Sequence, residues 1–167
     1  MNRWRHPVPD PVGPGQESVW DYPRPPRLET SARHVRVELG GVVVADSDRA
    51  LRVLETSHPP TYYVHPDDVA WQYLRPAPGG SLCEWKGQAS YWTVAAGDQL
   101  VEAGAWSYRD PTPHFAAIVD HVAFYPARFR CLLDDEPVTP QPGGFYGGWV
   151  TGELAGPFKG GPGTFGW

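Results

Sequence analysis

The sequence predicts a mainly β protein built from small antiparallel sheets and short helices. Glycine and proline contribute 19 and 20 of the 167 residues, and both interrupt helices while they punctuate short strands and turns. Aromatic residues make up 13% of the chain, and their side chains favour pleated surfaces and line pockets. The clearest local signal is HVRVELGGVVVAD, in which apolar and charged residues alternate up to a Gly-Gly pair. That pattern is typical of a β-hairpin.

The chain length fits one domain with a flexible arm at its start. Residues 1–17 are mostly polar and hold four prolines, so we expect them to be flexible. Residues 18–167 are expected to form the domain. Its last part, 137–167, holds ten glycines and five prolines but also six aromatic residues. A disordered tail seldom carries so many aromatic side chains, so we expect an irregular wrap that these residues anchor.

The first half of the domain predicts alternating strands and short helices. After the hairpin, residues 46–56 place apolar side chains at near-helical spacing behind an Asp or Ser that suits an N-cap, which predicts a short helix. Residues 61–64 (TYYV) predict a strand. Residues 65–74 predict a second short helix, with Pro66 at its first position and two aspartates in its first turn. The PAPGG stretch that follows predicts a loop.

The second half predicts a pair of strands and then one or two more. QASYWTVA (88–95) and QLVEAGAWSY (99–108) flank a Gly-Asp turn and predict an antiparallel pair. HFAAIV (114–119) predicts one helical turn. HVAFYPARFRCLL (121–133) predicts one or two strands, interrupted near Pro126 because proline cannot donate to a sheet.

Composition excludes several classes of function. The formal net charge is −5 and no run of lysine or arginine occurs, which argues against a nucleic-acid partner. No apolar stretch reaches the roughly 18 residues that a membrane span needs. The first residues lack the apolar core of a signal peptide, so Cys83 and Cys131 are expected to be reduced thiols in the cytoplasm. Their number and the histidine spacing fit no zinc site, and no cofactor is expected.

Aromatic side chains gather on the predicted strand pair. On one strand Trp92 shares a face with Ser90, and on the other Trp106 shares a face with Tyr108. If the strands pair, one face of the sheet carries Trp92, Trp106 and Tyr108 together. Such a cluster is either a core layer or the wall of a pocket for a flat ligand.

Ionisable residues sit in the turn before these strands. Lys86 either reaches over the sheet to an anion, a carbonyl or a cofactor, or is a solvated turn residue. Cys83 is either a nucleophile, with its pKa lowered by a nearby positive charge, or a small buried thiol. Glu84 is either a general acid or base, or half of a surface ion pair.

Two further candidates lie earlier in the chain. Glu55 ends the first predicted helix, where a carboxylate opposes the helix dipole, so it is either functional or merely solvated. Tyr62 and Tyr63 point to opposite faces of their strand, so one of them, taken here as Tyr63, can present its hydroxyl to a cavity.

A set of motifs resembles a known family. The stretches are RALRVLETSHPPTYYV, CEWKG-x-A-x-YW, AWSY-x-DPTP, VAFYPARF, PQPGGFYGGW and GPFKGGPGTFGW. Together they resemble the domain of unknown function numbered 427, over residues 18–167. The likeness is to a longer, actinobacterial-type branch with a glycine-rich C-terminal wrap.

This resemblance implies a β-tent, in which two small antiparallel sheets lean together over a cleft. Proteins of similar architecture, the ligand-binding domain of cereblon and methionine sulfoxide reductase B, usually hold zinc through two CxxC pairs, which this sequence lacks. In the family the turn often reads HCPxKG, whereas here it reads LCEWKG. Leu82 replaces the histidine, which argues against a Cys–His pair. The family sometimes carries a nucleotidyltransferase-like label, but this sequence has no paired-carboxylate motif to support it.

The sequence therefore favours a protein that binds a small, partly flat metabolite in a cleft between sheets. We expect Cys83 at the rim of this cleft or beneath it, with walls from Trp92, Trp106 and Tyr108, and polar contacts from Lys86, Glu55 and Tyr63. One alternative is a metal-independent enzyme that uses Lys86 with a carboxylate for proton transfer. Another is a protein-interaction module that uses the arm or the wrap. The sequence leaves the oligomeric state open.

Overall fold

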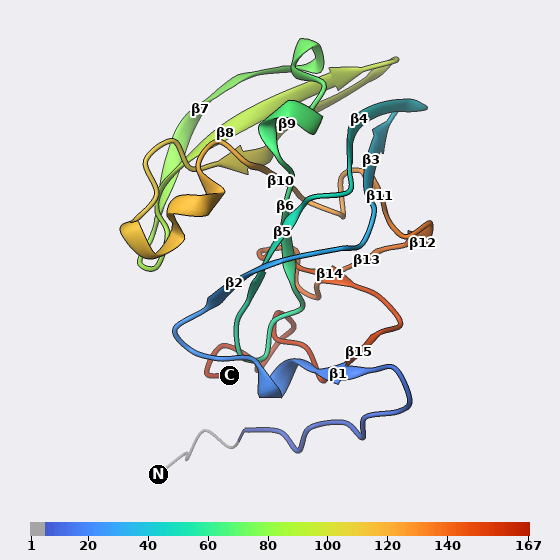
Figure 1. Ribbon diagram of the computed structural model, residues 1–167, viewed down its shortest axis with the longest axis vertical. Helices are drawn as coiled ribbons and strands as arrows, with labels where there is room; N and C mark the ends of the chain where they lie inside the picture. The colour runs from blue at the N-terminus through green and yellow to red at the C-terminus, as the bar shows by residue number, and fades with distance from the viewer. Residues whose placement is uncertain (1–5) are drawn as a thin grey trace.

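The protein is mainly β, as its computed structural model shows for residues 6–167 (Figure 1). Three antiparallel sheets hold most of its strands. The first sheet has the order β10-β9-β8-β7, with strands β7 (Leu74–Cys83), β8 (Gly87–Ala96), β9 (Gln99–Ser107) and β10 (Val122–Phe124). The second has the order β12-β11-β3-β4, with strands β3 (Val35–Leu39), β4 (Val42–Ser47), β11 (Arg130–Leu133) and β12 (Glu136–Pro137). The third, in the order β2-β5-β6, has strands β2 (Arg27–Thr30), β5 (Leu51–Leu54) and β6 (Thr61–Tyr63).

Two strand pairs and four short 3₁₀ helices complete the fold. One pair is parallel and joins β1 (Glu17–Ser18) to β15 (Leu154–Ala155). The other is antiparallel and joins β13 (Thr139–Pro140) to β14 (Trp149–Val150). The 3₁₀ helices are Val19–Asp21, Pro66–Asp68, Trp71–Tyr73 and Pro113–Ile118. The expected architecture of small antiparallel sheets is confirmed, with three sheets of three or four strands where two were expected.

Several predicted elements are confirmed. The β3–β4 hairpin turns at Gly40 and Gly41, whose φ angles of 58° and 78° suit a primed turn. Strands β8 and β9 pair antiparallel. The chain from His121 to Leu133 forms two strands, β10 and β11, and Pro126 lies between them. The predicted helical turn is the 3₁₀ helix Pro113–Ile118.

The helix predicted over residues 46–56 is wrong. This segment contains the end of β4 and the whole of β5, which pairs with β2 on one side and β6 on the other. Periodicity alone does not distinguish a short helix from a central strand when the apolar run is short. Leu51–Leu54 form a strand because pairing with a neighbouring strand on each side satisfies their backbone N–H and C=O groups within the sheet.

Two further segments differ from their predictions. Residues 65–74 form two single 3₁₀ turns, because the Ala70 N–H between them donates to the Val44 carbonyl (2.9 Å) and prevents a continuous helix. The PAPGG stretch lies within edge strand β7, whose register shifts between Pro76 and Gly80. Prolines are tolerated at bulges and on edge strands because they have no N–H to pair.

The first sheet lies between two apolar clusters. One of its faces packs against the second sheet through Val94, Ala105, Val122 and Phe124. Its other face carries Trp106 and joins a second cluster with residues of β5 and β6. Strand alternation divides the side chains between the two clusters. The third sheet continues from the edge of the first at a bridge between Val64 and Val122, with N···O distances of 2.8 and 2.9 Å.

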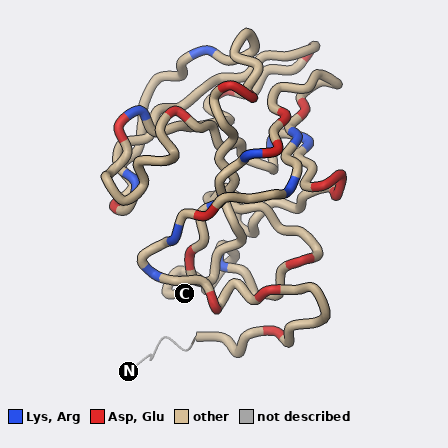
Figure 2. The backbone as a smooth tube through the Cα atoms, in the orientation of Figure 1, with Lys and Arg blue, Asp and Glu red and all other residues tan. Residues whose placement is uncertain are grey.

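The two ends of the described chain pack together near the base of the molecule (Figure 1). The Asp10 N–H donates to the Gly156 carbonyl at 2.8 Å, and the Trp20 indole donates to the Pro157 carbonyl at 2.9 Å. The predicted flexible arm, 1–17, falls partly outside the described residues, and its division from the domain stays a prediction. Acidic and basic residues are interspersed along the chain (Figure 2). Within residues 6–167 no helix is long and apolar enough to cross a membrane.

Candidate functional site

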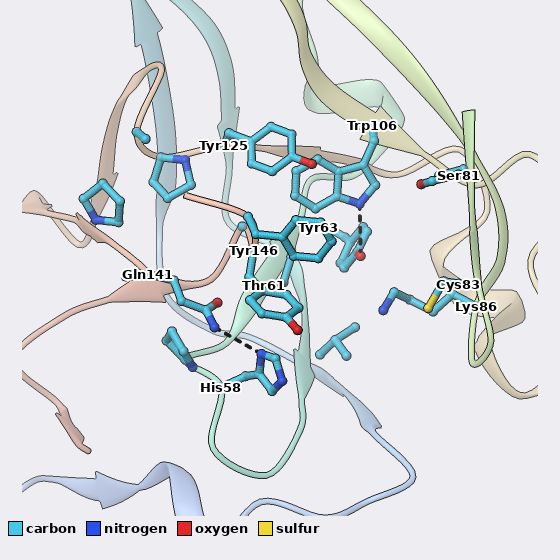
Figure 3. A pocket seen from close by; sticks show the side chains of 18 of the residues that line it. His58, Thr61, Tyr63, Ser81, Cys83, Lys86, Trp106, Tyr125, Gln141 and Tyr146 are labelled. Carbon is cyan, nitrogen blue, oxygen red and sulfur yellow. Dashed lines mark hydrogen bonds between the residues drawn. The ribbon is translucent and has the colours of Figure 1, made fainter. Parts of the chain in front are cut away.

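A cavity of about 690 Å³ lies where the first and third sheets meet the C-terminal wrap (Figure 3). Strands β7, β8 and β9 form one side, and β5 and β6 form another. The wrap, residues 137–167, closes the third side with Gln141, Tyr146 and Lys159 among others. The predicted site residues that line the cavity are Glu55, Tyr63, Cys83, Lys86, Trp106 and Tyr108.

An indole and several phenol rings form the apolar wall. The Trp106 ring stands 4.5 Å from that of Tyr125, between centroids. Its indole N–H donates to the Tyr63 hydroxyl at 3.4 Å. The ring centroids of Tyr63 and Tyr108 are 6.3 Å apart. Burial raises the pKa of both Tyr63 and Tyr108 above the ordinary value, so these phenols stay neutral.

Trp92 lies outside this wall. The register pairs Tyr91, not Trp92, with Trp106, so Trp92 faces the opposite side of the sheet. There its indole N–H donates to the Ser107 hydroxyl (2.9 Å) and its ring packs 5.1 Å from that of Trp71. The prediction that Trp92 shares one face with Trp106 and Tyr108 is therefore wrong, because the register places Trp92 on the opposite face of the sheet. Tyr91 lines the cavity in its place.

The turn between β7 and β8 carries Cys83 and Lys86 to the cavity. Thr112 holds this turn: its N–H donates to the Lys86 carbonyl at 3.0 Å, and its hydroxyl donates to the Trp85 carbonyl at 2.6 Å. The Lys86 amine lies 6.0 Å from the centre of the Phe115 ring and extends into the cavity (Figure 3). Cys83 is half-buried, whereas Glu84 is exposed and outside the lining.

Glu55 lies in a tight turn that also carries His58. The His58 N–H donates to the Glu55 carbonyl (3.0 Å), and Ser57 within this turn has a φ of 72°. The side chains meet as well, with 3.3 Å between His58 Nε2 and Glu55 Oε2. Arg24 contacts the same carboxylate oxygen at 3.2 Å. Sequence reasoning missed His58 because its partner Glu55 was placed at a helix end.

Neighbouring groups stabilise the ionised form of Glu55. Burial raises the pKa of its carboxyl, but the hydrogen bond with His58 and the charge of Arg24 outweigh burial, and the pKa is lowered. Glu55 is therefore ionised at neutral pH.

Gln141 fixes the tautomer of His58. Its side-chain carbonyl accepts from the Gly148 N–H (3.1 Å), and its amide nitrogen donates to the Lys159 carbonyl (2.8 Å). These two contacts orient the amide, so its nitrogen also faces His58 Nδ1 at 3.1 Å. Nδ1 must then accept, which places the proton of neutral His58 on Nε2, facing Glu55.

The wrap contributes side chains from far along the sequence. Tyr146 packs edge-on against His58 at 4.7 Å between centroids. Lys159 lies 5.8 Å from the Tyr146 ring and donates to the Trp167 carbonyl at 3.1 Å. Gly147 allows a close approach, because a Cβ there would lie 2.3 Å from the Trp106 ring. The aromatic density of the predicted wrap was the available signal for this contribution.

A family model described as a domain of unknown function (DUF427) matches residues 27–135, which is more than half of the chain. The chain belongs to the DUF427 family. The match covers the strands on two sides of the cavity, whereas the DUF427 protein's Gln141, Tyr146 and Lys159 lie beyond the matched residues. A comparison with curated proteins found no match. The assignment to an actinobacterial-type branch stays a prediction.

Proposed function

We propose that this DUF427 protein binds a small, partly flat metabolite in the cavity between the first and third sheets. The observation that carries the proposal is the wall of Trp106, Tyr63 and Tyr125, with Lys86 and Glu55 at the same cavity. Ligand sites are typically concave and mainly apolar, with a few polar groups that fix orientation. An indole face flanked by phenols suits a planar ring.

Polar side chains at the same cavity can fix the orientation of the ligand. Lys86, Glu55 and Tyr63 were expected to contact the ligand, and all three line the cavity. His58 and Gln141 add a fixed pair of hydrogen-bonding groups beside Glu55. Cys83 lines the cavity from β7 and is assigned no contact.

A thermal-shift screen against a metabolite library tests the proposal. A ligand at about 100 times its dissociation constant stabilises the folded state by about 2.7 kcal/mol. Thr61→Phe places a ring in the cavity from β6 and should abolish every genuine hit. Thr30→Phe is the matched control, because Thr30 is exposed on β2 of the same sheet. Hits that stabilise Thr61→Phe as much as the natural protein would place binding elsewhere and refute the proposal.

The alternatives stay predictions. Proton transfer by Lys86 with Glu55 needs a substrate that bridges them: both line the cavity, but within residues 6–167 their charged atoms form no ion pair within 4 Å. An interaction module would use exposed apolar side chains such as Phe165, which is 84% exposed. The cytoplasmic location also stays a prediction.

A further inference from the structure

The chain contains only two lysines, and both line the cavity. Lys86 and Lys159 are the only lysines among 14 basic residues, and the other twelve are arginines. They come from positions 73 residues apart, one in the β7–β8 turn and the other in the wrap. Lysine presents a compact ammonium on a flexible stem, whereas arginine presents a wide planar fork. The compact cation thus occurs at this cavity and nowhere else in the sequence.

Neither ammonium is paired with an Asp or Glu side chain among the described residues. Within residues 6–167, no Asp or Glu side-chain oxygen lies within 4 Å of Lys86 or Lys159, although Arg24, Arg49 and Arg52 all form such pairs. Lys159 donates instead to the main-chain oxygen of Trp167 at 3.1 Å. Arg128, which also lines the cavity, is equally without a pair in that range. Glu55 is the only acidic residue of the lining, and His58 and Arg24 already contact it. The cavity therefore has an excess of positive charge in a protein of net charge −5.

The neutral groups add hydrogen-bond donors to the two ammonium groups. Tyr146 makes no side-chain hydrogen bond with the described residues, and burial together with the charge of Glu55 raises its pKa, so its hydroxyl stays a donor. The Gln141 amide and His58 Nε2 already donate within the protein. The cavity thus offers a ligand two ammonium groups and several hydroxyl hydrogens, which suit an acceptor-rich partner.

We infer that the ligand is a flat acid whose carboxylate or phosphate is bound by Lys86 and Lys159. The inference rests on the proposed function and adds the charge of the ligand. An ammonium that is partly removed from water without an acidic side chain beside it loses solvation, and an oxyanion offsets that loss through charge-assisted hydrogen bonds. Burial and the charge of Arg24 lower the pKa of Lys159 and outweigh the opposite effect of Glu55, as expected of an ammonium that is partly removed from water. The ring of the acid would lie against Trp106.

Matched probes separate charge from shape. Calorimetric titrations compare 2-naphthoate, 2-naphthyl phosphate and the neutral 2-naphthamide, which share one flat ring system. Because a hydrogen bond to a charged group contributes about 1.5–3 kcal/mol, at least one acid should bind about tenfold or more tightly than the amide. The tighter of the two acids identifies the oxyanion as a carboxylate or a phosphate.

Variants that remove the lysine charges test whether Lys86 and Lys159 cause the preference for an acid over the amide. Lys86→Met and Lys159→Met should each reduce the acid-to-amide affinity ratio severalfold, and the double variant should bring it close to one. Arg75→Met is the matched control, because Arg75 is an exposed cation on β7 outside the cavity. It should keep the natural ratio. Circular dichroism spectra would establish that each variant is folded.

Three outcomes overturn the inference. One is equal affinity for the acids and the amide, another is a ratio that survives in the double lysine variant, and the third is no binding of either acid at about 10 mM. If 2-naphthamide binds as tightly as the acids and Thr61→Phe abolishes that binding, the cavity binds a flat ligand without charge preference. The proposed function then stands while this inference fails.

Discussion

At the scale of single residues, Gln141 organises the polar side of the cavity. Its side chain is 3% exposed and bonds His58 Nδ1, the Lys159 carbonyl and the Gly148 N–H. These partners lie on separate segments of the chain, so one amide links the Glu55–His58 turn to the wrap. The arrangement leaves the side chain no alternative orientation, because each of its atoms faces a partner of fixed polarity.

Gln141→Ala should therefore destabilise the protein strongly. The substitution leaves the buried N–H of Gly148 and the partly buried carbonyl of Lys159 without these partners, and a buried unpaired group costs about 1–3 kcal/mol. We expect the free energy of unfolding to fall by about 2–4 kcal/mol in urea titrations. Gln99→Ala is the control, because Gln99 is exposed and makes no side-chain hydrogen bond with the described residues. A loss below about 0.5 kcal/mol for Gln141→Ala would contradict the role given to the amide.

At the scale of elements, the fold depends on contacts between strands and short turns. The 3₁₀ helix Pro66–Asp68 is attached to β4 because Asp68 accepts from the Ser47 hydroxyl at 2.6 Å and from Arg49 Nε at 2.9 Å. The hydrogen bond from Arg49 has the largest effect on the Asp68 carboxyl, and that from Ser47 adds to it. Together they outweigh burial and lower its pKa from 3.8 to about 2.

This attachment should weaken in acid. The unfolded chain protonates Asp68 near the ordinary pKa of 3.8, whereas the folded protein does so only at about 2. The stability that ionised Asp68 contributes is complete above the unfolded pKa and is lost as the pH falls through that window. Urea unfolding at successive pH values should show a smaller acid loss for Asp68→Asn than for the natural protein. Asp67→Asn removes only a longer contact with the same Arg49 (3.9 Å) and should reduce the acid loss less than Asp68→Asn does.

At the scale of the whole molecule, the wrap is part of the core. Trp149 on β14 is fully buried in the cluster shared by the first and second sheets. Its ring lies 5.1 Å from that of Tyr62, and its backbone N–H donates to the Pro60 carbonyl at 2.8 Å. A glycine-rich segment without long strands is therefore ordered by its apolar anchors.

Removal of this anchor should cost more than any surface change in the wrap. Trp149→Ala leaves a large cavity, and such substitutions cost about 3–5 kcal/mol. Phe165→Ala removes a ring that is 84% exposed and should change the free energy of unfolding by less than about 0.5 kcal/mol. Equal and small effects in thermal or urea unfolding would show that the wrap contributes little to the core.

The sequence by itself determined the first hairpin and the shared face of two aromatic residues on β9 and the residue after it. Alternation in VRVEL and the Gly40–Gly41 pair predict the first hairpin, and the same periodicity places Trp106 and Tyr108 on one face. The places of Lys86 and Tyr63 in the cavity lining were also predictable, because their positions in a turn and a strand are local properties. Local spacing is sufficient in these cases because strand geometry fixes the direction of each side chain.

Only the tertiary structure decided the register and the long-range contacts. Pairing of Tyr91 with Trp106 sends Trp92 to the other face, and pairing on both edges makes Leu51–Leu54 a strand instead of a helix. Contacts of His58 and Gln141, 83 residues apart, complete the polar side of the cavity. No local pattern specifies these choices, because they depend on which distant surface satisfies the backbone and buries the apolar face.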